Sequence, residues 1–197
     1  MSEPEREMVL DSLAEREKLL LAAKNDYPDK VKFLADMIVE TIKSDGKILV
    51  CGNGGSAAES QHFAAEMVVR LTEKTERSAL PAISLTTDTS VITAGGNDYG
   101  FDKVFSRQVE ALGRKGDMLL ALSTSGNSTN VVAAVKTARE KEMETAALLG
   151  KGGGELAEIT NFSIVIPSQS VLRIQEEHLF VLHQLVELVQ ISFTPEF

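Results

Sequence analysis

The sequence of 197 residues carries 20 basic and 29 acidic side chains, which gives a net charge of −9. This acidic balance, without a basic stripe, excludes a nucleic-acid surface. A single cysteine excludes an internal disulfide framework and indicates a reducing compartment, so we expect a cytoplasmic protein. The charged start is unlike a targeting peptide, and no apolar run approaches the length of a membrane helix, so no membrane partner is expected.

Residues 1 to about 45 have the apolar spacing of helices. The first run extends to Ala22, and Tyr27-Pro28 is predicted to break it. A second amphipathic helix from Val31 is predicted to end near Asp45-Gly46. No catalytic grouping occurs here, so this N-terminal helical segment is interpreted as a surface for packing or oligomerisation.

From Lys47 onward, short apolar runs alternate with helical stretches. Near-continuous apolar runs are typical of parallel strands buried on both faces, and the alternation predicts an α/β layer sandwich. No internal repeat or linker divides the chain, so we expect one domain over residues 1–197. The predicted strands are 48–51, 81–85, 118–122, 145–149 and 162–166, and the predicted helices lie near 56–70, 103–112, 128–141 and 172–192.

Two loops follow predicted strands and open predicted helices: Gly52–Ala57 and Ser123–Thr129. Exposed backbone N–H groups and helix dipoles allow such loops to hold an anion, and the second loop adds hydroxyl side chains. The alternative is that these residues only cap and turn the chain. The first loop also fits a dinucleotide fingerprint, but the acidic residue expected about 20 positions later is missing. We therefore favour a site for a sugar phosphate.

His62 and Glu66 are four residues apart on one predicted helix, and Gln175 and His183 are eight apart on another. Each pair shares or adjoins one helix face, so two helices could offer ligands to a cation such as Zn²⁺. The alternative is an ordinary helix-surface contact. His178 lies about 140° from His183 around the helix, so we expect it to be solvent-facing or structural.

Three further residues or pairs have simpler interpretations. Asn97-Asp98 follows an apolar helical stretch in a Gly-rich context, which predicts a turn. Arg173 could pair with a phosphate or cap a helix start. Cys51, in a hydrophobic strand, is predicted to be a small core residue.

Several motifs together resemble the phosphoheptose isomerase family of the sugar isomerase (SIS) domain superfamily. The resemblance covers nearly the whole chain, and its N-terminal helices match in kind rather than by motif. The segments that carry it are Cys51–Ala58, Gln61–Glu66, Gly96–Phe101, Phe105–Gly113, Ser123–Ser128 and Arg173–Glu176.

The resemblance implies a flavodoxin-like three-layer sandwich with a five-stranded parallel sheet, preceded by N-terminal helices. It implies a homotetramer with active sites at subunit interfaces. The implied metal ligands, for one Zn²⁺ per subunit, are His62, Glu66, Gln175 and His183. The implied substrate contacts are Asn53, Gly54, Gly55, Glu66, Asn97, Asp98, Ser123, Thr124, Ser125, Ser128 and Gln175.

The implied reaction is the conversion of sedoheptulose 7-phosphate to D-glycero-D-manno-heptose 7-phosphate through an enediolate. It is the first step towards activated heptoses of lipopolysaccharide core, capsule or S-layer glycans. Glu66 is the candidate for moving the proton between carbons, and His183 for exchanging the proton at oxygen. A carboxylate held tightly by a metal is a poorer base, so the two roles of Glu66 are in conflict.

The main alternative is a non-catalytic SIS-domain regulator that binds the DnaA replication initiator. Such regulators lack the equivalents of Glu66 and His183, and both are present here. A sugar-phosphate sensor joined to a DNA-binding module is disfavoured because no helix-turn-helix with a basic face occurs. A nicotinamide-dependent oxidoreductase is disfavoured by the missing acidic residue.

Overall fold

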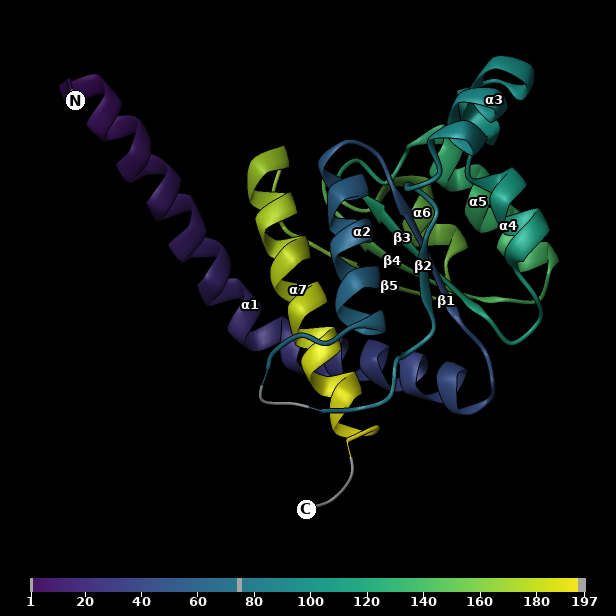
Figure 1. The fold of residues 1–197 in the computed structure, drawn as a ribbon. Coiled ribbons are helices and arrows are strands. Elements are labelled where there is room, and N and C mark those ends of the chain that lie inside the picture. Colours follow the sequence, from purple (N-terminus) through teal and green to yellow (C-terminus); the bar gives the residue numbers. More distant parts are fainter. Residues whose placement is uncertain (1, 74–75, 195–197) are drawn as a thin grey trace.

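The computed structural model describes residues 2–73 and 76–194 of the chain, which form a parallel sheet with helices on both faces (Figure 1). The strand order is β2-β1-β3-β4-β5, and every neighbouring pair is parallel. This confirms the predicted three-layer sandwich with a five-stranded sheet. The strands are β1 (Ile48–Gly52), β2 (Ala82–Ser84), β3 (Met118–Ser123), β4 (Glu144–Leu149) and β5 (Phe162–Val165).

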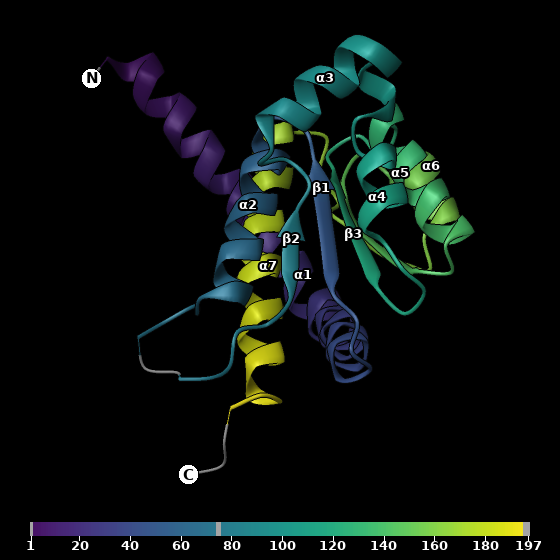
Figure 2. The ribbon, with the colours of Figure 1, turned by 45° about the vertical axis from the view of Figure 1, so that its right-hand side comes forward.

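Helices cover the two faces of the sheet unequally. The two long helices and α2 pack on one face, whereas α4, α5 and α6 pack on the other (Figures 1 and 2). The helices are α1 (Glu3–Lys43), α2 (Gly55–Val68), α3 (Thr89–Tyr99), α4 (Ser106–Leu112), α5 (Thr129–Glu140), α6 (Gly154–Ile159) and α7 (Val171–Ile191), and a 3-10 turn covers Phe101–Lys103.

Alternate strand residues supply the two hydrophobic cores. Leu120 faces the core beneath α1, α2 and α7, and its neighbour Leu119 faces the core beneath α4 and α5. Both are fully buried, because successive side chains of a strand point to opposite faces and both faces are covered. Truncating such a leucine to alanine costs about 2–5 kcal/mol of stability.

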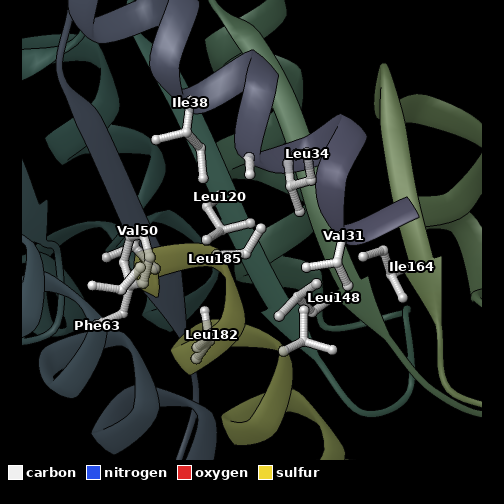
Figure 3. Packing of buried hydrophobic residues seen from close by; sticks show 14 of the residues in the cluster. Val31, Leu34, Ile38, Val50, Phe63, Leu120, Leu148, Ile164, Leu182 and Leu185 are labelled. Carbon is white, nitrogen blue, oxygen red and sulfur yellow. The ribbon is translucent and has the colours of Figure 1, made fainter. Parts of the chain in front are cut away.

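The larger core joins α1, α7 and the sheet. Figure 3 shows Leu34 and Ile38 of α1 and Leu182 and Leu185 of α7 around the strand residue Leu120. All of these side chains are at most 2% exposed. This packing fixes α7 against the sheet, and α7 carries two of the predicted metal ligands.

The predicted break at Tyr27-Pro28 is wrong, because α1 is one continuous helix with Pro28 inside it. Pro28 is exposed, and so is Lys24, the residue whose carbonyl loses its usual partner. Burial of Tyr27 and Val31 against the body offsets the cost. The helix axis changes direction partway, as expected at an internal proline, and the first half projects away from the sheet (Figure 1).

Two short helices differ from the sequence predictions. Helix α3 begins at an Asp88 cap and continues to Tyr99, so Asn97-Asp98 lies in its last turn rather than in the predicted turn. Helix α6 was missed because its six residues are too few to show a helical period. In the part of the chain that is described, none of the helices combines the length and the apolar character that crossing a membrane requires.

Candidate active site

The two glycine- and serine-rich loops are neighbours in space. They leave β1 and β3, which pair directly, with Gly52 opposite Leu122. In the order β2-β1-β3 the chain reverses its winding direction between β1 and β3, which is where open α/β sheets bind ligands. Asn53 and Asn130 join the loops through reciprocal amide hydrogen bonds of 2.8 and 2.9 Å. Asn130 was missed in the sequence analysis, because its pattern is that of an ordinary helix residue.

The second loop gathers hydroxyl groups around one turn. Ser123 Oγ lies 3.0 Å from Ser128 Oγ and 3.5 Å from Ser125 Oγ, and it accepts a hydrogen bond from the backbone N–H of Gly126. Thr124 is half-buried beside them. Ser128 stands at the N-cap of α5 but makes no capping bond within the described chain. The first N–H groups of α5 therefore face the loop without a side-chain acceptor, as an anion site requires.

Helix α2 starts directly after the first loop, with Gly54 at a positive φ of 57° as its N-cap. Gly55 lies against the side chain of Gln175 on α7, so closely that a Cβ at position 55 would collide with the Gln175 amide. A side chain at position 55 would therefore displace the Gln175 amide from its place beside α2. The same contact places Gln175 at the loop end of α2.

Seven residues after Gly55, α2 meets α7 again through two histidines. His62 Nε2 lies 2.9 Å from His183 Nε2, with the rings edge to face. Oε1 of Glu66 lies 3.0 Å from His62 Nε2 and 3.5 Å from His183 Nε2. Both imidazoles are partly exposed, whereas the Glu66 side chain is 12% exposed. The predicted pair His62 and Glu66 thus meets His183 from the second predicted pair.

The donor set of this cluster fits a zinc ion. The ligand atoms of His62, Glu66 and His183 all lie within 4.8 Å of one another, and two imidazole nitrogens with a carboxylate are a usual zinc set. Two facing Nε2 atoms can share at most one hydrogen bond, so a cation resolves their contact better than a proton does. Oε2 of Glu66 is buried and has no hydrogen-bond partner among the described residues.

Gln175 is not part of this cluster in the structure. It lies two helical turns before His183, which is about 12 Å along the axis of α7, and its amide contacts Gly55. Three of the four predicted ligands therefore converge in this chain. The fourth stays a prediction, and so do the assigned substrate contacts.

Within the described chain, no hydrogen bond joins Asn97 or Asp98 to either loop. They are exposed on α3, and the Asn97 amide donates to Asp98 at 2.7 Å. Not one of the eleven residues described for α3 is buried. Helix α3 projects beyond the carboxyl ends of the strands (Figure 2). These two residues therefore present polar groups above the sheet edge without packing that fixes them.

Three residues outside the loops have clear structural roles. Arg173 donates to the Ser12 carbonyl and to Glu176, so it ties α7 to α1. Cys51 is fully buried, which confirms the core prediction, and burial raises the pKa of its thiol to about 12. His178 is also fully buried, so the solvent-facing alternative is wrong. Its angle from His183 was right, but that direction points to Glu59 of α2, not to water.

Comparison with known proteins identifies the family and the fold of the chain. A family model for the SIS domain matches residues 13–150. The phosphoheptose isomerase of Aliarcobacter butzleri is 55% identical over 151 residues, which are 77% of this chain and 79% of that protein. The phosphoheptose isomerase of Chlorobaculum parvum is 49% identical over 185 residues, or 93% and 88% of the two chains. A solved phosphoheptose isomerase from Neisseria gonorrhoeae has 44% identity and a TM-score of 0.87, covering 93% and 97% of the chains.

Proposed function

Because this chain belongs to the phosphoheptose isomerase family of SIS-domain proteins, we propose that it converts sedoheptulose 7-phosphate to D-glycero-D-manno-heptose 7-phosphate. The observation that carries the proposal is the convergence of His62, Glu66 and His183 about two helical turns from the two glycine- and serine-rich loops. A ketose phosphorylated on its last carbon reacts at its first two carbons. Such a substrate needs an anion site and a reactive site separated along its length, and α2 connects the two.

The loops would hold the phosphate. Ser123, Ser125 and Ser128 offer hydroxyl donors, and the N-termini of α2 and α5 offer backbone N–H groups. These groups bind an anion by local dipoles, so the overall charge of −9 does not prevent binding. Thr124, Asn53, Gly54 and Gly55 complete the proposed contacts, with Asn97 and Asp98 reaching the sugar from α3.

Glu66 is proposed to move the proton between the two carbons. Its two oxygens have different surroundings: Oε1 faces the histidines, whereas Oε2 has no partner within the described chain. Because Oε2 is buried, Oε1 is the oxygen that can face both a metal and a substrate in this conformation, so action as the base requires the carboxylate to loosen its contact with the metal. The chemistry is proton abstraction next to a carbonyl, and it requires a base at carbon and an electrophile at oxygen.

We propose that His62, Glu66 and His183 would hold one zinc ion per subunit, with Gln175 as the predicted fourth ligand. Bound zinc supplies a Lewis acid that polarises the carbonyl and stabilises negative charge on oxygen. His183 Nε2 can carry the proton exchanged at oxygen only while it is not a ligand. Binding zinc and carrying a proton therefore exclude each other at this nitrogen at any one moment.

The proposal extends to assembly and pathway. We propose a homotetramer with active sites between subunits, in the cytoplasm, acting in the first step of activated-heptose synthesis for lipopolysaccharide core, capsule or S-layer glycans. Exposed apolar residues on the projecting half of α1, among them Leu10, Leu13 and Leu21, support the oligomer.

The test is to incubate the purified protein with sedoheptulose 7-phosphate and to follow the appearance of the aldose by NMR. Fructose 6-phosphate serves as a shorter control substrate. Conversion of the seven-carbon substrate with clear preference over the control is the expected result. If neither substrate is converted while the protein binds DnaA, the regulatory alternative replaces the isomerase.

A further inference from the structure

Helices α2 and α7 run side by side and meet at three successive levels. The first is the contact of Gly55 with Gln175, and the third is the contact of His62 with His183. Between them lies a pair that the proposed mechanism does not use: Glu59 Oε2 and His178 Nδ1, 3.9 Å apart. Both atoms are buried and lack a hydrogen-bond partner within the described residues.

The protonation of His178 follows from its other ring nitrogen. Nε2 lies 3.2 Å from the carbonyl oxygen of Leu149, the last residue of β4. A carbonyl can only accept, so Nε2 must carry a proton. Burial lowers the pKa of His178 to about 4, which keeps the ring neutral. In a neutral ring with a proton on Nε2, Nδ1 carries a lone pair that can only accept a hydrogen bond, so it needs a donor.

Glu59 is the only described side chain that the structure pairs with this lone pair. Its side chain is 11% exposed, and burial raises its pKa to about 7. An ionised Glu59 would place two acceptors against each other in an apolar seam, which is costly. A protonated Glu59 can instead donate to Nδ1 after a small rotation of its side chain.

We propose that Glu59 and His178 are positioning residues: protonated Glu59 donates to Nδ1 of His178, whose Nε2–H donates to the Leu149 carbonyl, and this hydrogen-bond chain sets the spacing of α2 and α7 at the metal-ligand cluster. Glu59 precedes His62 by one helical turn, and His178 lies between Gln175 and His183 on α7. A change in this middle contact therefore moves the ligands directly. The inference rests on the proposed zinc site.

The test measures zinc affinity by competition with a chelator dye for the wild type and for two variants of Glu59. Glu59→Gln keeps a donor towards Nδ1 and should bind zinc within about threefold of the wild type. Glu59→Leu removes the donor and should weaken zinc binding by roughly 10–100-fold, the usual effect of losing a group that orients ligands. Rescue by glutamine distinguishes positioning from charge.

Glu177 provides the matched control. It is a buried carboxyl on α7, next to His178, but it faces Tyr27 of α1 rather than α2. Glu177→Leu should lower thermal stability and leave zinc affinity within about threefold. An equal loss of affinity in Glu177→Leu and Glu59→Leu would overturn the inference, because the effect would then be general destabilisation.

A second measurement covers the case in which Glu59→Leu does not fold. Long-range nitrogen NMR of the zinc-loaded wild type should show His178 protonated on Nε2 and unprotonated on Nδ1. A proton on Nδ1 would overturn the inference. If the wild type binds no zinc, the proposed metal site fails as well, whereas tight wild-type binding that Glu59→Leu leaves unchanged overturns only the positioning role.

Discussion

The seam between α2 and α7 contrasts with two exposed elements, helix α3 and the first half of α1. The seam holds three levels of contact: Gly55 against Gln175, the buried pair Glu59 and His178, and the facing imidazoles of His62 and His183. Helix α3, by comparison, has no buried residue among its eleven, although it carries two predicted substrate contacts.

This contrast separates the part of the proposed active site that one chain packs firmly from the part that it leaves exposed. The reactive groups lie between rigid helices packed on the sheet, as a catalytic site requires. Met8, Leu13 and Tyr99, on α1 and α3, are each more than half exposed. Apolar surface of this extent is typical of a subunit interface. In the proposed tetramer, a second copy of the chain would cover this apolar surface.

The largest expected effect on turnover comes from replacing the proposed base on α2. Glu66→Gln keeps the size of the side chain and removes the base, so turnover should fall by roughly 10²–10⁴-fold. The fold should survive, because Glu66 lies on a helix that other residues anchor. Isomerase assays with circular dichroism on the same samples check this, and full activity would remove Glu66 from the mechanism.

The second prediction tests the exposed region. Leu13→Glu with Leu20→Glu places charges where both leucines are about half exposed in the single chain, so intrachain packing should hardly change. The proposed tetramer should dissociate into smaller species, and activity per chain should fall with it. Light scattering during size-exclusion chromatography measures this. Asp11→Lys, exposed on the opposite face of the same helix, is the control, and an unchanged assembly in the double variant would exclude the face of Leu13 and Leu20 as the interface.

A smaller effect on kcat/KM is expected from the loop Ser123–Thr129, where the proposal places the phosphate. Ser128→Ala removes one hydroxyl donor to a charged ligand, worth about 1.5–3 kcal/mol, so kcat/KM should fall roughly 10–150-fold, mainly through KM. Steady-state kinetics measure it. Ser192→Ala, an exposed serine after α7, should have no effect. A fall in kcat alone would place Ser128 at the chemistry rather than at the phosphate.

The smallest effect concerns pH and stability. Burial raises the pKa of Glu59 from 4.5 to about 7, so its contribution to stability falls as pH rises through that window. Burial lowers the pKa of His178 from 6.5 to about 4, so its contribution falls as pH drops from 6.5 towards 4. The two slopes oppose each other between pH 4.5 and 6.5.

Glu59→Gln removes the pH dependence of stability that Glu59 contributes. The variant should lose stability on acidification from pH 6.5 to 4.5 more steeply than the wild type, by up to about 1.4 kcal/mol per pH unit. Urea denaturation at three pH values measures the difference. Equal slopes in the two proteins would show that Glu59 does not hold its proton in the folded state.

The sequence predicted well where local periodicity and chemistry agreed. Buried strands such as Met118–Ser123 appear as apolar runs, and helical spacing brought His62 near Glu66. It failed at Pro28, because long-range packing of Tyr27 and Val31 overrides a local helix breaker. It also missed the Glu59–His178 pair, since contacts between two helices depend on how they pack rather than on spacing within either one.

Zinc reconstitution tests the central claim most directly, that the side chains joining α2 and α7 form the metal centre of an isomerase. Protein stripped with a chelator would be titrated with zinc while conversion of sedoheptulose 7-phosphate is followed. Activity should be low at the start, rise with added zinc and saturate near one ion per chain. Full activity of the metal-free protein, unchanged by zinc, would contradict the account.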